Sequence, residues 1–149
     1  MSTYIQNRKA HFNFEILDTL EAGLALLGHE VKSIRKGHGK LDGAHIIVRG
    51  GEAYLVNASI TPYQVANTPK KYDPERPRKL LLSKKELLLL EKKTETERLT
   101  AVPLKLYNAG RYIKLSVAIA RGKKKQDKRE SLKERDSKRE IERTLKSQI

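Results

Sequence analysis

The sequence predicts a mainly β fold, a small closed antiparallel barrel with two or three short helices. Apolar and polar side chains alternate through most of residues 12–120, a pattern typical of strands with one buried face. About six such runs, interrupted by two helical segments, fit into about 110 residues, and this favours a barrel of the oligonucleotide-binding type. A β-sandwich is the alternative, but the inserted helices interrupt the strand series that it needs.

The strands are expected where the alternation is strict. They cover residues 12–16, 20–26, 45–48, 52–60, 102–106 and 113–119. Glycine-containing turns join two pairs of these strands, at Gly50-Gly51 and at Asn108-Ala109-Gly110. Glu21 and Lys114 fall on the polar side of their strands, so both side chains are expected to face outward.

Two helices are expected between the strands. The first runs from about His29 to Lys36 and ends at Gly37. The second begins with Ser83-Lys84-Lys85-Glu86, in which the Ser oxygen and the Glu carboxylate satisfy free amides of the first turn. It runs to about Lys92 and is expected to bury three leucines, Leu87, Leu88 and Leu90.

A long surface loop is expected over residues 61–79. Four of the five prolines lie there, and the segment has no apolar period. Loops of this length within a compact domain are usually functional or disordered.

The charge distribution separates a domain over residues 1–121 from a basic tail over residues 122–149. From Arg121 to the end the chain carries 12 Lys and Arg against 6 acids, without an aromatic residue or a Pro. We expect this tail to be disordered when free and to become a basic helix against a polyanion, since Lys124, Lys128, Arg135 and Arg139 would share one helical face. A solvated tail that keeps the protein soluble is the alternative interpretation.

The remainder of the chain is basic as well. The net charge is +14, and residues 121–149 contribute 12 − 6 = +6, which leaves +8 for residues 1–120. A polyanionic partner is therefore expected, because neutralised phosphates release counterions. An acidic membrane is the rival partner, but the chain has no Trp and no apolar run of membrane length. The absence of Cys and of an apolar leader indicates a cytoplasmic protein without disulfides.

Five phrases resemble the family of SsrA-binding proteins, in the same order. They are NRKA at 7–10, LEAGL leading to GHEVKSIR at 20–35, DPERPRKLLL at 73–82, VPLKLY at 102–107 and GKKKQDKR at 122–129. The resemblance spans residue 7 to about residue 140. It implies a barrel that binds the tRNA-like domain of transfer-messenger RNA and accompanies it into the A site of stalled ribosomes.

The resemblance also implies the partners. They are transfer-messenger RNA, the decoding centre, the mRNA path and ribosomal RNA, with the elongation factor that delivers aminoacyl-tRNA as a further candidate. The tail would become helical in the empty mRNA path and report that no message is left. No membrane partner and no cofactor are expected.

The same resemblance assigns the site residues. Glu21, Leu81 and Lys114 lie where the family meets its RNA, although Leu81 stands between two leucines and could equally be a core residue. Two basic groups would contact phosphates, and such contacts position an RNA without specifying its sequence. They are Lys32, Arg35 and Lys36 on the first helix and Arg76, Arg78 and Lys79 on the Pro-rich loop.

In the tail, the residues that match the family's signature are Lys123, Lys124, Asp127, Lys128 and Arg129. Arg and Lys can bind ribosomal RNA phosphates there, as would Arg135 and Arg139 further along the tail, while Asp127 is suited to cap a helix. Gln126 stands where the family usually has His or an aromatic residue, so stacking on a base is not expected at that position.

No catalytic motif competes with this interpretation. The four histidines lack HxxxH or HxH spacing for a metal, and neither a phosphate-binding GxxxxGK[ST] loop nor a GxSxG motif occurs. Non-enzymatic RNA binding is therefore the leading hypothesis. A ribosomal protein with a basic extension is the runner-up, and an RNA-processing enzyme is less favoured.

Overall fold

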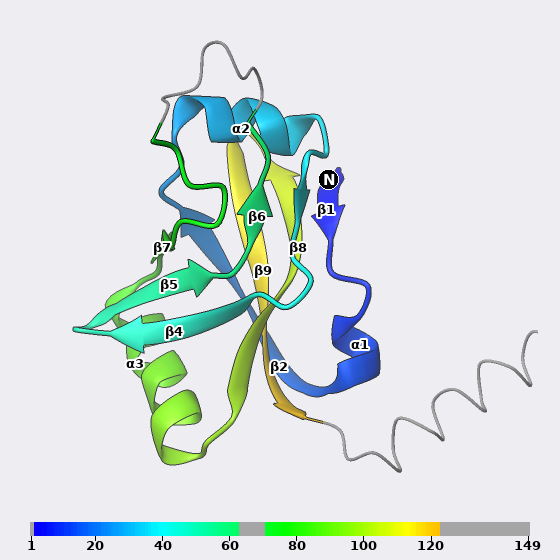
Figure 1. The fold of residues 1–149 in the computed structure, drawn as a ribbon. Coiled ribbons are helices and arrows are strands. Elements are labelled where there is room, and N and C mark those ends of the chain that lie inside the picture. The colour runs from blue at the N-terminus through cyan, green and yellow to red at the C-terminus, as the bar shows by residue number, and fades with distance from the viewer. Residues whose placement is uncertain (1, 63–70, 123–149) are drawn as a thin grey trace, which may run out of the picture.

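The structure, a computed structural model, describes residues 2–62 and 71–122. Six antiparallel strands form a closed ring, in which β8 pairs β4, β4 pairs β5, β5 pairs β7, β7 pairs β2, β2 pairs β9 and β9 returns to β8 (Figure 1). Two further strands form a separate ribbon, β3 with β6, and β1 adds to the outer edge of β8. The predicted mainly β class is confirmed, whereas the oligonucleotide-binding type stays a prediction.

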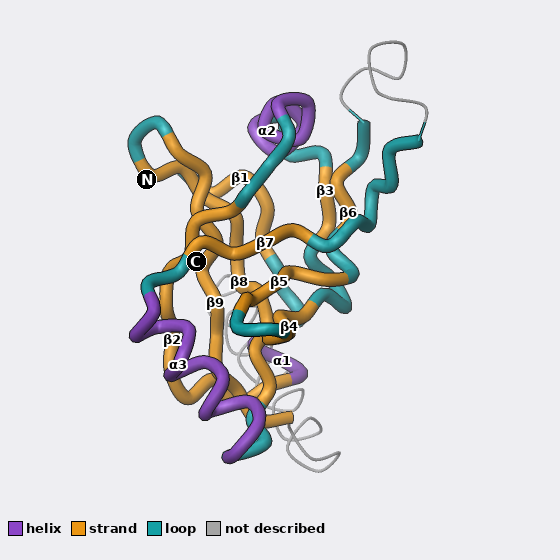
Figure 2. Tube along the Cα trace, turned by 90° about the vertical axis from the view of Figure 1, so that its left-hand side faces the viewer, coloured by secondary structure: helices purple, strands orange, loops and turns teal. Residues whose placement is uncertain are grey.

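The elements follow the chain closely. The strands are β1 Thr3–Gln6, β2 Phe14–Leu24, β3 Gly39–Lys40, β4 His45–Arg49, β5 Glu52–Val56, β6 Ser59–Ile60, β7 Arg78–Leu81, β8 Thr100–Ala109 and β9 Tyr112–Gly122. The helices are α1 Ala10–Asn13, α2 Gly28–Arg35, α3 Lys84–Glu91 and a π-helical turn η2 Lys92–Thr96. In Figures 1 and 2, α2 lies at one end of the ring, and α1 and α3 lie at the other end.

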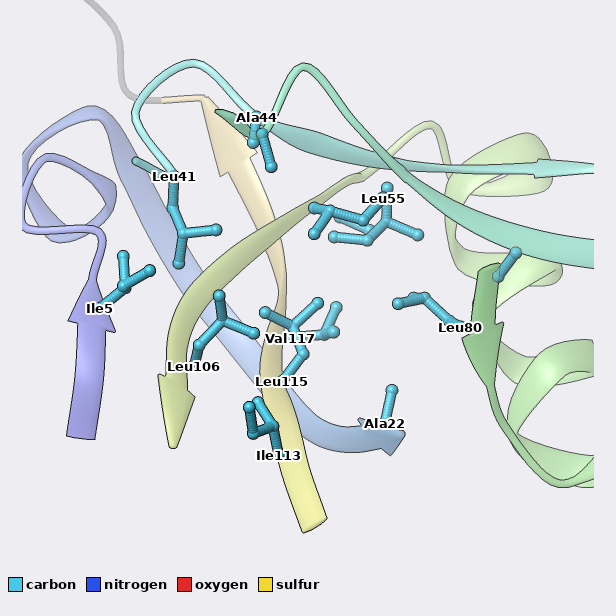
Figure 3. Packing of buried hydrophobic residues seen from close by; sticks show 14 of the residues in the cluster. Ile5, Ala22, Leu41, Ala44, Leu55, Leu80, Leu106, Ile113, Leu115 and Val117 are labelled. Atoms are coloured by element: carbon cyan, nitrogen blue, oxygen red, sulfur yellow. The ribbon is translucent and has the colours of Figure 1, made fainter. Parts of the chain in front are cut away.

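The main core fills the ring with aliphatic side chains (Figure 3). The predicted alternation of β9 is confirmed, because Ile113, Leu115, Val117 and Ile119 are all buried in this core. A smaller cluster contains Val102, Ala118 and Ala120. Val102 belongs to it, while Leu106 lies in the main core, because the register of β8 shifts between Pro103 and Lys105. A shift of one residue moves every following side chain to the opposite face.

The predicted Gly50-Gly51 turn and the predicted helix cap are confirmed, whereas the turn expected at Asn108-Ala109-Gly110 is shorter. Asn108 and Ala109 still pair with β9, and Gly110 and Arg111 form the turn. Gly50 and Gly51 have φ of 60° and 73°, so they join β4 and β5 in the left-handed conformation that two-residue hairpin loops require. At the start of α3, the Glu86 amide donates to Ser83 Oγ and the Ser83 amide donates to a Glu86 carboxylate oxygen, both at 3.2 Å. The capping box therefore fixes where α3 begins.

Several predicted boundaries are wrong for local reasons. Phe12 lies in α1, whose amides bond to the carbonyls of the preceding turn, and the strand begins only at Phe14. The expected strand over residues 52–60 is broken at Asn57, whose φ of 63° is incompatible with an extended chain. The predicted burial of Leu88 is also wrong: this side chain is 57% exposed, while Leu90 is fully buried.

The two runs expected over residues 12–16 and 20–26 form one strand, β2. A register shift between Ile16 and Asp18 divides its pairing with β9, and this irregularity interrupts the apolar alternation without ending the strand. At the other end, β9 continues to Gly122, one residue past the expected domain boundary, while the tail beyond it lies outside the described residues.

Candidate nucleic-acid interface

Strands β7, β2 and β9 bring together three of the predicted site residues. Gly23 in the middle strand pairs with Leu81 on one side and with Lys114 on the other. Glu21 lies two residues before Gly23 and therefore faces the same side of the sheet. Glu21, Leu81 and Lys114 come from distant parts of the sequence, yet they form one outward-facing group, which we call the sheet strip.

Leu81 is a surface residue. Its side chain is 55% exposed, whereas that of the preceding Leu80 is 3% exposed and lies in the core. A Cβ atom at Gly23 would approach Leu81 Cβ to 3.2 Å, so the glycine leaves room for the leucine to lie close to the middle strand. The alternative of Leu81 as a core residue is therefore excluded, while its contact with RNA stays a prediction.

A buried tyrosine adjoins Glu21. Tyr107 on β8 pairs with Lys114 in the sheet register, and only 3% of its surface is exposed. Burial raises the pKa of the Tyr107 phenol to about 12, and the nearby Glu21 carboxylate adds to this effect. Among the described residues the Tyr107 hydroxyl has no partner within hydrogen-bond geometry, so the two groups are close without a formed bond. Glu21 is exposed, and a carboxylate has lone pairs beyond the one nearest Tyr107, so it can accept from an external donor.

The basic residues of α2 lie beside the turn between β8 and β9. Arg35 Nη2 donates to the Arg111 carbonyl oxygen at 3.3 Å, and this contact joins the end of the helix to the turn. Lys32, Arg35 and Lys36 are all exposed, and their i, i+3 and i+4 spacing places them on one side of α2 and its C-cap. The sequence prediction that these three residues form one exposed basic group agrees with the structure, while their contact with phosphate stays a prediction.

A buried ion-pair network fixes α2 to the segment that follows residue 71. The Glu30 carboxylate is completely buried and receives hydrogen bonds from both Arg76 and Arg78. Arg78 Nε and Nη2 lie 2.9 and 2.6 Å from Glu30 Oε2. The Tyr72 hydroxyl lies 3.0 Å from the same oxygen and accepts from Arg78 Nη2 at 3.0 Å. Each charge in this network therefore has a partner, as burial requires.

The prediction that Arg78 lies on a surface loop and contacts phosphate is wrong. Arg78 is the first residue of β7 and has no exposed surface. Its remaining donors bind the Ala58 and Pro74 carbonyl oxygens at 2.7 and 2.8 Å. A guanidinium without exposed surface, whose three nitrogens all donate inside the protein, cannot reach an RNA phosphate.

The other two basic residues of that segment have different positions. The Arg76 side chain is 28% exposed and is held by Glu30, so its guanidinium is only partly accessible. Lys79 is exposed and forms an ion pair of 2.9 Å with the exposed carboxylate of Glu52. Exposed pairs contribute at most about 1 kcal/mol, so Lys79 can exchange this partner for a phosphate at low cost. Lys79 and Leu81 are two apart on β7 and share a face.

Acid is expected to destabilise the wild-type protein more than a Glu30→Gln variant. Burial alone would raise the pKa of Glu30, but hydrogen bonds from Arg76, the Leu27 amide and Arg78 outweigh burial and lower this pKa from 4.5 to about 2. Since the folded value is the lower one, the ionised carboxylate stabilises the fold above about pH 4.5, and this stabilisation is lost as the pH falls toward 2. Denaturant unfolding of both proteins between about pH 7 and pH 3 measures the effect. Parallel pH profiles would contradict it.

Sequence reasoning missed two features of the site. Glu30 was not singled out from the sequence, and only the fold shows that it neutralises two arginines far along the chain. Tyr112, the first residue of β9, was not singled out, yet its side chain is 73% exposed. Its place in a strand of alternating burial, directly before the buried Ile113, was the available signal.

The remaining predictions concern the tail and absent groups. The predicted tail residues Lys123, Lys124, Asp127, Lys128, Arg129, Arg135 and Arg139 all lie outside the described residues. Within residues 2–62 and 71–122, no three His, Asp or Glu side chains gather in a way that could hold a metal ion. In the same part of the chain no helix has the length and apolarity to span a membrane.

The fold and the site define a class: a small basic β protein that presents a polar sheet face beside exposed cations, as RNA-binding domains do. The family model described as SmpB protein matches residues 4–147. An SsrA-binding protein from Chelativorans sp. (strain BNC1) is 52% identical over 147 residues, which cover 98% of this chain and 94% of the relative. One from Mesoplasma florum is 50% identical over 140 residues, 94% of each chain.

A solved structure shows the same relationship. One of its chains, from "tmRNA-SmpB: a journey to the center of the bacterial ribosome", is 43% identical with a TM-score of 0.69 and covers 88% of this chain and 95% of that chain. The chain described here belongs to the SmpB protein family.

Proposed function

We propose that this protein is an RNA-binding ribosome-rescue factor. It binds the tRNA-like domain of transfer-messenger RNA, delivers it to the A site of stalled ribosomes and probes the empty mRNA path with its tail. The observation that carries the proposal is similarity over nearly the whole chain to proteins named for binding SsrA, together with a structural neighbour named for tmRNA and the ribosome. The alternative, a ribosomal protein with a basic extension, finds no support in these relatives.

The three residues of the sheet strip are suited to three different kinds of contact with RNA. The Glu21 carboxylate is suited to accept hydrogen bonds from a base amino group or a ribose hydroxyl of an unpaired nucleotide. Lys114 beside it supplies charge for a phosphate, and Leu81 supplies apolar contact. Lys32, Arg35, Lys36 and Lys79 extend the positive surface on either side, which fixes the RNA without reading its sequence.

The protein acts by binding, without catalysing a reaction, and works in the cytoplasm, where ribosomes translate. The ribosome is its second partner through the tail, and the elongation factor that delivers aminoacyl-tRNA is a further candidate partner. The tail's 11 cations against 6 acids suit a path lined by ribosomal RNA phosphates.

Replacing Glu21 with Ala is expected to weaken binding of the tRNA-like RNA by about 1–3 kcal/mol, roughly 5- to 150-fold, because RNA donors buried at the interface lose their acceptor. A purely electrostatic surface predicts the opposite sign, since the variant removes a negative charge from a basic protein. Gel shifts with the tRNA-like domain and with an unrelated RNA of equal length measure the difference.

Glu15→Ala is the matched control. Glu15 lies on the same strand β2, its side chain is 60% exposed, and it forms a long ion pair of 3.9 Å with the exposed Arg121. The control removes the same charge and should bind the RNA as tightly as wild type or slightly more tightly. Unchanged or tighter binding by a folded Glu21→Ala protein would remove Glu21 from the interface.

A further inference from the structure

Tyr112 presents a largely exposed aromatic ring to solvent. It is 73% exposed, the highest value among the large hydrophobic side chains that the structure describes. The neighbouring Ile113, by contrast, is 7% exposed and belongs to the core. Burying a tyrosine ring removes much apolar surface from water, and most of that surface stays exposed here.

The backbone under this ring is fixed from two sides. Gly110, with φ of 63°, forms the turn before β9. Arg35 Nη2 donates to the Arg111 carbonyl oxygen at 3.3 Å, and the Asn108 amide donates to the Ser2 carbonyl oxygen at 2.8 Å. Because the backbone is anchored, the exposed ring is already held in place. Covering it with a ligand therefore costs the protein little conformational entropy.

The surroundings of Tyr112 are cationic and continuous with the sheet strip. Residues 112, 114 and 116 alternate with the buried side chains of β9, so Tyr112 and Lys114 lie on the same face of that strand. Arg111 precedes the ring in the chain, and Arg35 reaches the same turn from α2. An aromatic ring between cations matches a nucleotide, whose base stacks while its phosphates pair with the cations.

We propose that Tyr112 is a stacking platform for an unpaired base of the bound RNA, at the end of the sheet strip next to α2. This inference rests on the proposed function and adds a contact to it: Glu21 and Lys114 would bind the polar edges and backbone of the unpaired nucleotides, and Tyr112 would bind the flat face of one base. A protein partner would need a larger apolar patch around the ring, whereas the side chains placed beside it by the turn and by β9 are the cations Arg35, Arg111 and Lys114.

Substitutions at position 112 separate stacking from apolar contact. Tyr112→Phe and Tyr112→Trp keep an aromatic face and are expected to bind the tRNA-like RNA within about twofold of wild type. Tyr112→Leu and Tyr112→Ala lose the face and are expected to bind on the order of 10-fold more weakly. None of these variants should alter the melting temperature appreciably, because the side chain is exposed.

The Trp variant also gives a direct optical readout. The protein contains no Trp, so Tyr112→Trp introduces a single tryptophan whose emission a stacked base would quench. Leu88→Trp is the matched control: Leu88 is 57% exposed on α3, at the end of the ring opposite α2 (Figure 1), and its emission should not change on RNA binding.

The outcomes distinguish the inference from the proposed function. If wild type binds the RNA while Tyr112→Ala and Tyr112→Leu bind equally well, or the tryptophan at 112 is not quenched, stacking at this position is wrong and the proposed function stands. Equal losses in Phe, Leu and Ala variants would indicate a role of the hydroxyl and would also overturn stacking. A wild-type protein that fails to prefer the tRNA-like RNA over an unrelated RNA would overturn both.

Discussion

Replacing Glu30 with Gln is expected to destabilise the folded protein by about 3–5 kcal/mol, the usual cost of removing one partner from a buried ion pair. The substitution preserves size but leaves the Arg78 guanidinium, which has no exposed surface, without its counter-charge. Arg76 can turn partly toward water, since its side chain is 28% exposed, so the loss arises mainly at Arg78. Denaturant unfolding at about pH 7 measures the free energy.

Glu52→Gln provides a control with the same chemical change in an exposed pair. Glu52 and Lys79 lie 2.9 Å apart, with side chains 43% and 46% exposed. Screening by water limits such a pair to about 1 kcal/mol or less. Equal losses of stability in the two variants would contradict the conclusion that the buried network holds α2 against the Tyr72–Arg78 segment.

The same network explains why part of the site could not be predicted from sequence. Glu30, Tyr72 and Arg78 are separated by up to 48 positions, and nothing local distinguishes Arg78 from its neighbours Arg76 and Lys79. In a Pro-rich segment of high charge, surface exposure is the natural expectation for all three. Only the pairing of β7 with β2 and β5 shows that Arg78 points inward while Lys79 points outward.

The features that could be predicted depend on short-range rules. The alternation in β9, the two-glycine turn and the Ser83 capping box each involve neighbours within a few positions, and each was correctly placed. The outward direction of Glu21 followed from strand period alone. Its proximity to Leu81 and Lys114 required either the strand order, which alternation does not contain, or the family resemblance, which pointed to the same three residues.

Truncation after Gly122 is expected to abolish ribosome rescue and to leave binding of the tRNA-like RNA within about threefold of wild type. The cut retains all of β9, including the pair between Phe14 and Gly122, so the ring of strands stays complete. It removes 11 of the 32 Lys and Arg residues, and the apolar residues lost are too few to form a packed face. Gel shifts and an in vitro assay of nascent-chain tagging on stalled ribosomes test the two halves of this expectation.

Truncation removes both the length and the charge of the tail. A full-length protein with Lys124, Lys128 and Arg129 changed to Glu tests the charge alone. If these cations bind ribosomal RNA phosphates, the reversed tail should fail in tagging as the truncated protein does, while melting temperature and affinity for the tRNA-like RNA stay near wild type. Each lost phosphate contact should also make the slope of log affinity for the ribosome against log salt concentration shallower by about one. Normal tagging by this variant would exclude charge as the basis of tail function.

A large loss of affinity for the tRNA-like RNA in the truncated protein would instead place the tail in the RNA interface, beside the sheet strip.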